Sequence, residues 1–129
     1  KLINQVVLID YIIIILGDGK MFNLVIDLEM CKVPRDYRSN SYKYATETIQ
    51  IGAVLLDDSF KRIGTLCQYV HPEHGVIDYF IENLTGIKNS QVKNAPKLEE
   101  VLLHMINWLG ERDYKIYAWS ESDRDQLLP

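Results

Sequence analysis

Asp27 and Glu29 are two carboxylates separated by a single residue within a short apolar stretch of the chain. On an extended strand, side chains two residues apart leave the same face, so these carboxylates lie close enough to share a divalent cation. The same pattern also occurs on the solvated face of a half-exposed strand, where acidic residues have no chemical role. Taken alone, the pair favours the solvated-face interpretation.

Asp123 is a third acidic residue in a position that could serve chemistry. It follows a short apolar segment at 115–119 and stands at the start of an expected helix. Aspartate favours such a position as an N-terminal cap, because its side chain accepts a hydrogen bond from a free backbone N–H. A carboxylate fixed at a helix start is also well placed to hold a metal, so both interpretations stay open.

The element that would carry the first pair is a strand over residues 22–30. Its apolar residues alternate with the others and form one face: Phe22, Leu24, Ile26, Leu28 and Met30. A polar loop over 31–44 follows and is long enough to be functional. Further strands are expected at 48–56 and 61–70, joined by a turn at 57–59, so the three strands form an antiparallel meander.

The second half of the chain predicts helices and one more strand. A short helix is expected at 78–84, a turn at 85–87 and a helical piece near 90–92. The strongest helical period of apolar residues predicts a helix over 96–109, which Gly110 ends. It is followed by an expected strand at 115–119 and the start of a helix at 123–128. This order predicts an α/β domain with a mixed sheet, an antiparallel meander and then a parallel strand, compatible with a ribonuclease-H-like architecture.

Composition narrows the class of protein. The chain has 129 residues, of which 47% are hydrophobic and 25% charged, as in one globular domain. Its two cysteines have neither the spacing of a zinc site nor a disulfide framework, so we expect a reducing, cytoplasmic setting. A net charge of −4 argues against nonspecific coating of nucleic acid, but a carboxylate site that recruits cations is itself acidic.

The first 20 residues are expected to lie outside the domain. An apolar run at 6–16 is about 11 residues long, whereas a membrane-spanning helix needs about 20, so no membrane association is expected. Met21 stands directly before the first predicted strand. We therefore expect residues 1–20 to be an upstream extension and residues 21–129 to form the domain.

Four motifs in order resemble the DEDD superfamily of 3'-to-5' exonucleases, which includes the proofreading exonucleases of polymerases. The first is Asp27-Leu28-Glu29, and the last is Trp119-Ser120-Glu121-Ser122-Asp123 with Leu127, which is similar to the Trp-Gly-x-x-Asp-x-x-x-Leu form of the enhanced-RNAi, RNA-trimming branch. Between them, residues 47–54 resemble the family's second strand, and residues 84–87 resemble its short motif beside the terminal nucleotide. The resemblance covers residues 21–128.

The sequence departs from the family pattern in two places. Ser120 replaces the usual glycine, and the third motif, His-x-x-x-x-Asp or Tyr-x-x-x-Asp, would lie beyond Pro129. The 129 residues are therefore expected to be the N-terminal two-thirds of the exonuclease domain and to be inactive or nearly so by themselves. His104 lies before Asp123 and cannot replace the missing histidine, and His71 and His74 are interpreted as ordinary surface residues.

The resemblance implies a two-metal-ion site with Mg²⁺ or Mn²⁺, to which Asp27, Glu29 and Asp123 would contribute catalytic carboxylates. It implies that Leu28, Met30, Leu84 and Thr85 meet the 3'-terminal nucleotide, although Leu84 could equally be a core residue. The implied substrate is the 3' end of single-stranded RNA or DNA, while Glu47, Glu121 and Asp125 are interpreted as having no part in the site. Two alternatives remain: a catalytically dead module that binds nucleic-acid ends, and a structural domain without nucleic acid.

Overall fold

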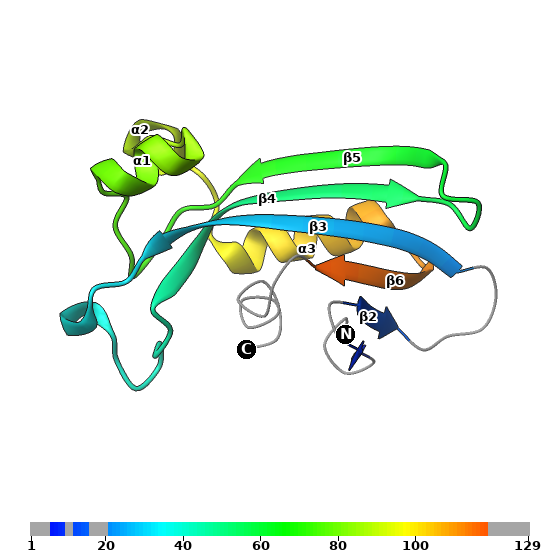
Figure 1. The fold of residues 1–129 in the computed structure, drawn as a ribbon, viewed down its shortest axis with the longest axis horizontal. Coiled ribbons are helices and arrows are strands. Elements are labelled where there is room, and N and C mark those ends of the chain that lie inside the picture. The colour runs from blue at the N-terminus through cyan, green and yellow to red at the C-terminus, as the bar shows by residue number, and fades with distance from the viewer. Residues whose placement is uncertain (1–5, 10–11, 16–20, 119–129) are drawn as a thin grey trace. The chain divides into compact units, whose positions relative to one another are not determined.

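The computed structural model describes residues 6–9, 12–15 and 21–118, and from residue 21 onward its elements follow the order that the sequence predicts (Figure 1). The strands are β1 (Val6–Ile9), β2 (Ile12–Ile15), β3 (Met21–Lys32), β4 (Thr46–Leu56), β5 (Arg62–Tyr69) and β6 (Asp113–Ala118). The α-helices are α1 (Tyr79–Thr85), α2 (Asn89–Val92) and α3 (Leu98–Leu109), and a 3-10 turn, η2, covers Arg35–Tyr37. The helix expected at 123–128 lies outside the described residues.

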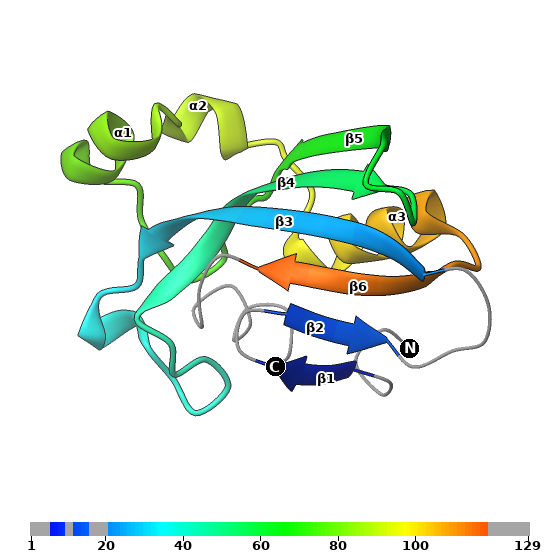
Figure 2. The same cartoon turned by 45° about the vertical axis from the view of Figure 1, so that its right-hand side comes forward.

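The strands form one mixed sheet in the order β1-β2-β6-β3-β4-β5. The arrows of β3, β4 and β5 alternate in direction in Figures 1 and 2, which confirms the predicted meander. β6 pairs in parallel with β3, from Met21 opposite Asp113 to Ile26 opposite Ala118. β2 pairs with β6 in antiparallel orientation and with β1 as a hairpin. The expectation that residues 1–20 lie outside the domain stays a prediction.

The chain divides into two compact units, which are described separately. Unit 1 comprises Lys1–Asp27, Gly52–Cys67 and Leu103–Pro129. Its buried side chains include Leu24 and Ile26 of β3, Met105 and Leu109 of α3, and Ile116 of β6. A Cβ on Gly64 would lie 3.1 Å from the Trp108 ring, so the glycine lets α3 approach β5 closely.

Unit 2 comprises Leu28–Ile51 and Gln68–Leu102. Its core cluster contains one strand residue from each of β3 and β4 together with residues from the α1 and α2 region: Cys31, Ile49, Ile77, Ile81, Ile87 and Val92. The alternation of buried and exposed side chains along β3 changes phase here. After Leu28, the next buried residues of the chain are Cys31 and Val33. Met30 is therefore only half-buried, whereas Cys31, which the sequence analysis assigned to a loop, belongs to the core.

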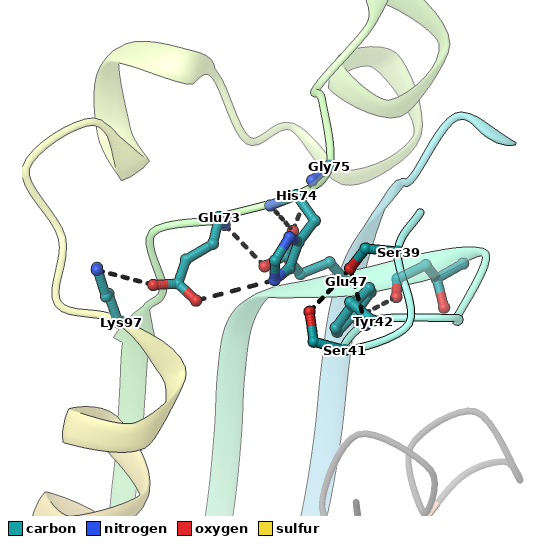
Figure 3. A network of polar contacts seen from close by, with 9 residues as sticks. Ser39, Ser41, Tyr42, Glu47, Glu73, His74, Gly75 and Lys97 are labelled. Carbon is teal, nitrogen blue, oxygen red and sulfur yellow. Dashed lines mark hydrogen bonds and ion pairs between the residues drawn. The ribbon is translucent and has the colours of Figure 1, made fainter. Parts of the chain in front are cut away.

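Unit 2 is organised around the carboxylate of Glu47, which is 8% exposed (Figure 3). Its oxygens accept three backbone N–H groups from one segment: Glu73 at 2.7 Å, His74 at 2.7 Å and Gly75 at 2.6 Å. Hydrogen bonds to a charged acceptor are about twice as strong as neutral ones, and a buried charge needs such partners. The carboxylate thus fixes the main chain of residues 73–75 against β4.

Fixing residues 73–75 also fixes the approach to α1. A Cβ on Gly75 would lie 2.5 Å from Cys31 Sγ and 2.8 Å from the Lys32 carbonyl oxygen, so only glycine fits at this contact with β3. The next residue, Val76, donates its N–H to Lys32 at 2.9 Å and forms an isolated β-bridge with it. α1 begins three residues later and so starts from a segment held on both β3 and β4.

The outer side of the same segment carries weaker contacts (Figure 3). Lys97 pairs with Glu73 at 2.8 Å, and this hydrogen bond lowers the pKa of Glu73. The His74 ring stacks on Tyr42 with a centroid distance of 4.5 Å. These groups are half-buried or exposed, so each adds less than the buried carboxylate does.

Replacing Glu47 by glutamine is expected to destabilise the protein. One oxygen becomes an amide group that faces backbone N–H donors, so at least one buried donor loses its acceptor, at a cost of about 2–3 kcal/mol. The matched control is Glu73→Gln, which weakens the ion pairs of the exposed Glu73 side chain with Lys97 and His74 and should cost about 1 kcal/mol or less. Urea unfolding measures both free energies, and equal losses in the two variants would contradict the role assigned to Glu47.

The two cysteines are expected to differ in reactivity. Burial raises the pKa of the Cys31 thiol from 9.0 to about 12, the carboxylate of Glu47 acts in the same direction, and Cys67 is exposed. A disulfide reagent at pH 8 should therefore titrate one thiol in the native chain and both after unfolding, and Cys67→Ser should remove the fast reaction. Because the folded-state pKa is the higher one, the contribution of Cys31 to stability should be complete below pH 9.0 and decline toward pH 12. Rapid labelling of Cys31 in the native protein would show that its burial is wrong.

Candidate active site

The carboxylates predicted to bind metal lie where β3 turns its polar face outward. Asp27 is exposed and Glu29 is half-buried, while the alternating residues Ile26 and Leu28 are buried. The strand period that the sequence analysis used is therefore the one that β3 adopts up to Leu28. Val25 shares the outward face and is 37% exposed, so this face is open at the position before Asp27.

The donor set on this face fits a hard divalent cation. Asp27 and Glu29 offer carboxylate oxygens, which suit Mg²⁺ and Mn²⁺ and do not favour softer metals. Within residues 21–118, no three His, Cys, Asp or Glu side chains come together in a way that could hold a metal ion. The third expected ligand, Asp123, lies outside the described residues, so the structure places two of the three predicted carboxylates.

Residues Leu28 and Met30, which were predicted to meet the terminal nucleotide, have different environments. Leu28 is 7% exposed and its side chain belongs to the core, so only its main chain could face a ligand. Met30 is half-buried at the position where the burial of β3 changes phase. Its unbranched thioether side chain can adapt to a flat apolar group.

Leu84 and Thr85, the other predicted nucleotide contacts, end helix α1. Asp78 caps the start of this helix by accepting the Ile81 N–H at 2.9 Å, and Gly86 ends it in the left-handed conformation with φ 75°. Leu84 is 70% exposed, so the alternative that it is a core residue is wrong. Thr85 is half-buried, and its hydroxyl donates to the Ile81 carbonyl and accepts the Ile87 N–H. Thr85 therefore shapes the helix end, while Leu84 presents free apolar surface.

α1 is docked on the end of β3 that carries Met30. Ile77 and Ile81 pack with Cys31 in the core cluster of unit 2. On the surface, Lys32 Nζ lies 3.8 Å from the Asp78 carboxylate and 4.5 Å from the centre of the Phe80 ring. The structure thus brings the two elements with predicted nucleotide contacts together in one unit.

The other groups that could act as bases or nucleophiles have structural roles. His71 Nδ1 lies 2.9 Å from the Val92 carbonyl oxygen, and His74 stacks on Tyr42, so both histidines are half-buried and make local structural contacts. Cys31 is buried, and the raised pKa of its thiol keeps it protonated at neutral pH, so it is a poor nucleophile. His104 is exposed on α3 in unit 1.

The structural role of Glu47 was not predicted, although the sequence contains a signal for it. Glu47 stands in phase with the buried residues of β4, Ile49, Ile51, Ala53 and Leu55. A carboxylate in the apolar stripe of a strand must be paired or hydrogen-bonded. That rule identifies a buried, satisfied charge but not its partners, which lie 26 to 28 residues further along the chain.

Comparisons with known proteins agree with this architecture. A sequence profile of the family described as Exonuclease (RNase_T) matches residues 24–118, which include Asp27 and Glu29. No curated protein sequence matches the chain significantly. None of the helices in the described part of the chain has the length and apolar character that crossing a membrane requires.

Several solved structures share the fold. The nuclease domain of 3'hExo, a DEDDh family member bound to rAMP, is 25% identical, with a TM-score of 0.61 over 80% of this chain and 54% of that chain. A 3'-exonuclease in a structure of 3'-end recognition of a histone mRNA stem-loop is 24% identical, with a TM-score of 0.62 over 77% and 36%. Cell-death related nuclease 4 is 23% identical, with a TM-score of 0.54 over 68% and 29%.

These matches determine the fold and the family. The chain spans between 29% and 54% of the lengths of these three matched chains. The predicted mixed sheet of ribonuclease-H-like type is confirmed, since the sheet order and the parallel β3–β6 pair occur in a chain that aligns with these nucleases. The profile match covers β3 through β6, and the chain therefore belongs to the RNase_T exonuclease family of the DEDD superfamily.

Proposed function

We propose that the protein is a 3'-to-5' exonuclease that removes nucleotides from the 3' ends of single-stranded nucleic acid with the help of two Mg²⁺ or Mn²⁺ ions. The observation that supports it most directly is the outward placement of Asp27 and Glu29 on β3 within an exonuclease-family domain. Asp123 would complete the set of carboxylates that this chain supplies. Two cysteines without a disulfide are in keeping with a reducing, cytoplasmic setting.

The carboxylates of β3 would act by holding cations against the scissile phosphate. When bound, such ions activate an attacking water and neutralise the charge on the leaving oxygen. The side chains of Asp27 and Glu29 are fixed by a strand whose opposite face is buried, so they need little reorganisation to orient a ligand. Without cations they would repel a phosphate, which is why a purely binding role is the weaker hypothesis.

Leu84 and Met30 would hold the terminal nucleotide by apolar contact. An exposed leucine on a well-capped helix offers a rigid surface for the face of a base. A frayed, single-stranded end is required, because a base inside a duplex has no free face. RNA and DNA both present such a face.

The metal site is tested by Asp27→Asn, with Asp58→Asn at an exposed turn position as the matched control. For a metal at 100 times its dissociation constant, the expected gain in unfolding free energy is about 2.7 kcal/mol, and Asp27→Asn should lose most of it. Calorimetry with and without Mn²⁺ measures this gain. An equal response to Mn²⁺ in the wild type and Asp27→Asn would rule out the assignment.

The nucleotide contact is tested by Leu84→Ala, with Leu103→Ala on α3 as the control, since both leucines are more than half exposed. If Leu84 packs on a base, its truncation should weaken binding of an oligonucleotide by about 1–2 kcal/mol, about 5- to 30-fold. Fluorescence anisotropy in Ca²⁺ measures the dissociation constant. Unchanged affinity for Leu84→Ala, or the same loss for Leu103→Ala, would contradict this contact.

A further inference from the structure

The loop between β3 and β4 carries a positive charge in an acidic chain. Residues 32–44, here called the basic loop, contain four cations, Lys32, Arg35, Arg38 and Lys43, and one acidic residue, Asp36. The whole chain has 14 basic and 18 acidic residues, so the basic loop has the opposite sign of charge to the chain as a whole. All four cationic side chains are exposed.

The basic loop has a defined conformation. Its ends are closed by a hydrogen bond of 2.8 Å from the Val33 N–H to the Ala45 carbonyl oxygen. Ser39 and Tyr42 exchange backbone hydrogen bonds at 2.9 and 3.2 Å, and Arg38 Nε donates to the Val33 carbonyl oxygen at 3.1 Å. A loop that is ordered before binding loses less conformational entropy when a ligand arrives.

Arg38 has this structural partner, but two other cations of the basic loop do not. Within the described part of the chain, neither the Arg35 nor the Lys43 side chain makes a hydrogen bond or an ion pair. The two cationic groups are therefore exposed and available to an anionic ligand. A polyanion would make favourable contacts with them.

Exposed aromatic rings accompany these cations. Tyr37 of the basic loop is 57% exposed, and on α1 Tyr79 is 79% and Phe80 57% exposed. Lys32 joins the two groups, since its ammonium lies over the Phe80 ring at 4.5 Å. Cations for the backbone and exposed rings for the bases are the combination by which proteins bind single strands.

We propose that the basic loop binds the sugar-phosphate backbone of the nucleotides that precede the 3'-terminal one, with Arg35 and Lys43 as the principal phosphate contacts. This inference rests on the proposed exonuclease function and extends it from the terminal nucleotide to the strand behind it. Lys32 follows Met30 on β3 and is in contact with α1, so the loop begins directly beside the residues proposed to hold the terminal base. The partner is a single-stranded polynucleotide and not an isolated mononucleotide.

The test compares Arg35→Gln/Lys43→Gln with the charge-matched control Lys61→Gln/Arg62→Gln, whose cations are exposed at the start of β5. The probes are 5'-fluorescein dT12 and rU12, with a 5'-fluorescein thymidine mononucleotide, which has no nucleotide behind its 3' end, as the reference, and anisotropy is measured in Ca²⁺ over a range of NaCl. If two phosphate contacts are lost, the slope of log affinity against log salt should fall by about 1.4, and affinity at 0.1 M salt by about 10-fold or more. Binding of the mononucleotide should stay unchanged, and Lys43→Gln alone should give a smaller loss of 12-mer affinity in the same direction.

Equal losses in the two double variants would overturn the inference, because they would reflect net charge and not the loop. Unchanged 12-mer binding in the loop variant, or a wild type that does not bind the 12-mers, would overturn it as well. Hydrolysis of the 4-nitrophenyl ester of thymidine 5'-monophosphate in Mn²⁺ separates this result from the proposed function. That small substrate needs the carboxylates but has no strand behind it, so the loop variant should retain wild-type rates whenever the wild type is active.

Discussion

The interaction on which unit 2 depends is the buried carboxylate of Glu47 with its three backbone donors. Taking a charge out of water costs several kcal/mol, and three charge-assisted hydrogen bonds offset that cost only while all are made. The arrangement therefore permits one conformation of residues 73–75. From it follow the contact of Gly75 with β3 and the position from which α1 starts.

Acidic side chains serve opposite purposes on neighbouring strands. On β4, Glu47 points inward and is saturated with donors, whereas on β3 Asp27 is exposed and Glu29 half-buried. Glu47 is buried and accepts three backbone N–H groups, so of the described carboxylates on these two strands the β3 pair is better suited to metal. The side chains of Asp27 and Glu29 provide a donor set of hard oxygens.

Sequence patterns were sufficient to predict a feature wherever that feature depends on the hydrophobic period of a single strand or helix. Alternation placed Asp27 on the outer face of β3, and the short helix expected at 78–84 with a turn at 85–87 corresponds to α1 and its end at Gly86. Patterns failed where distant segments meet. The phase change that buries Cys31 arises because residues of the α1 and α2 region pack on the end of β3. The partner of His71 Nδ1 is the carbonyl oxygen of Val92, 21 residues away. Asp123 lies outside the described residues, so its role as a ligand stays a prediction.

The distribution of charge suggests how an acidic protein could hold a polyanion. Carboxylates on β3 repel phosphate until cations neutralise them, and this effect is short-ranged because salt screens exposed charges beyond about 8 Å at physiological ionic strength. Cations in the basic loop would attract the strand by the same screened interaction. Salt screens the interaction between a metal ion and several coordinating oxygens far less. Rising salt should therefore weaken binding of the strand to the basic loop before it affects cleavage at the 3' end. Strand binding and bond cleavage would then depend on different residues, with different responses to the same solution.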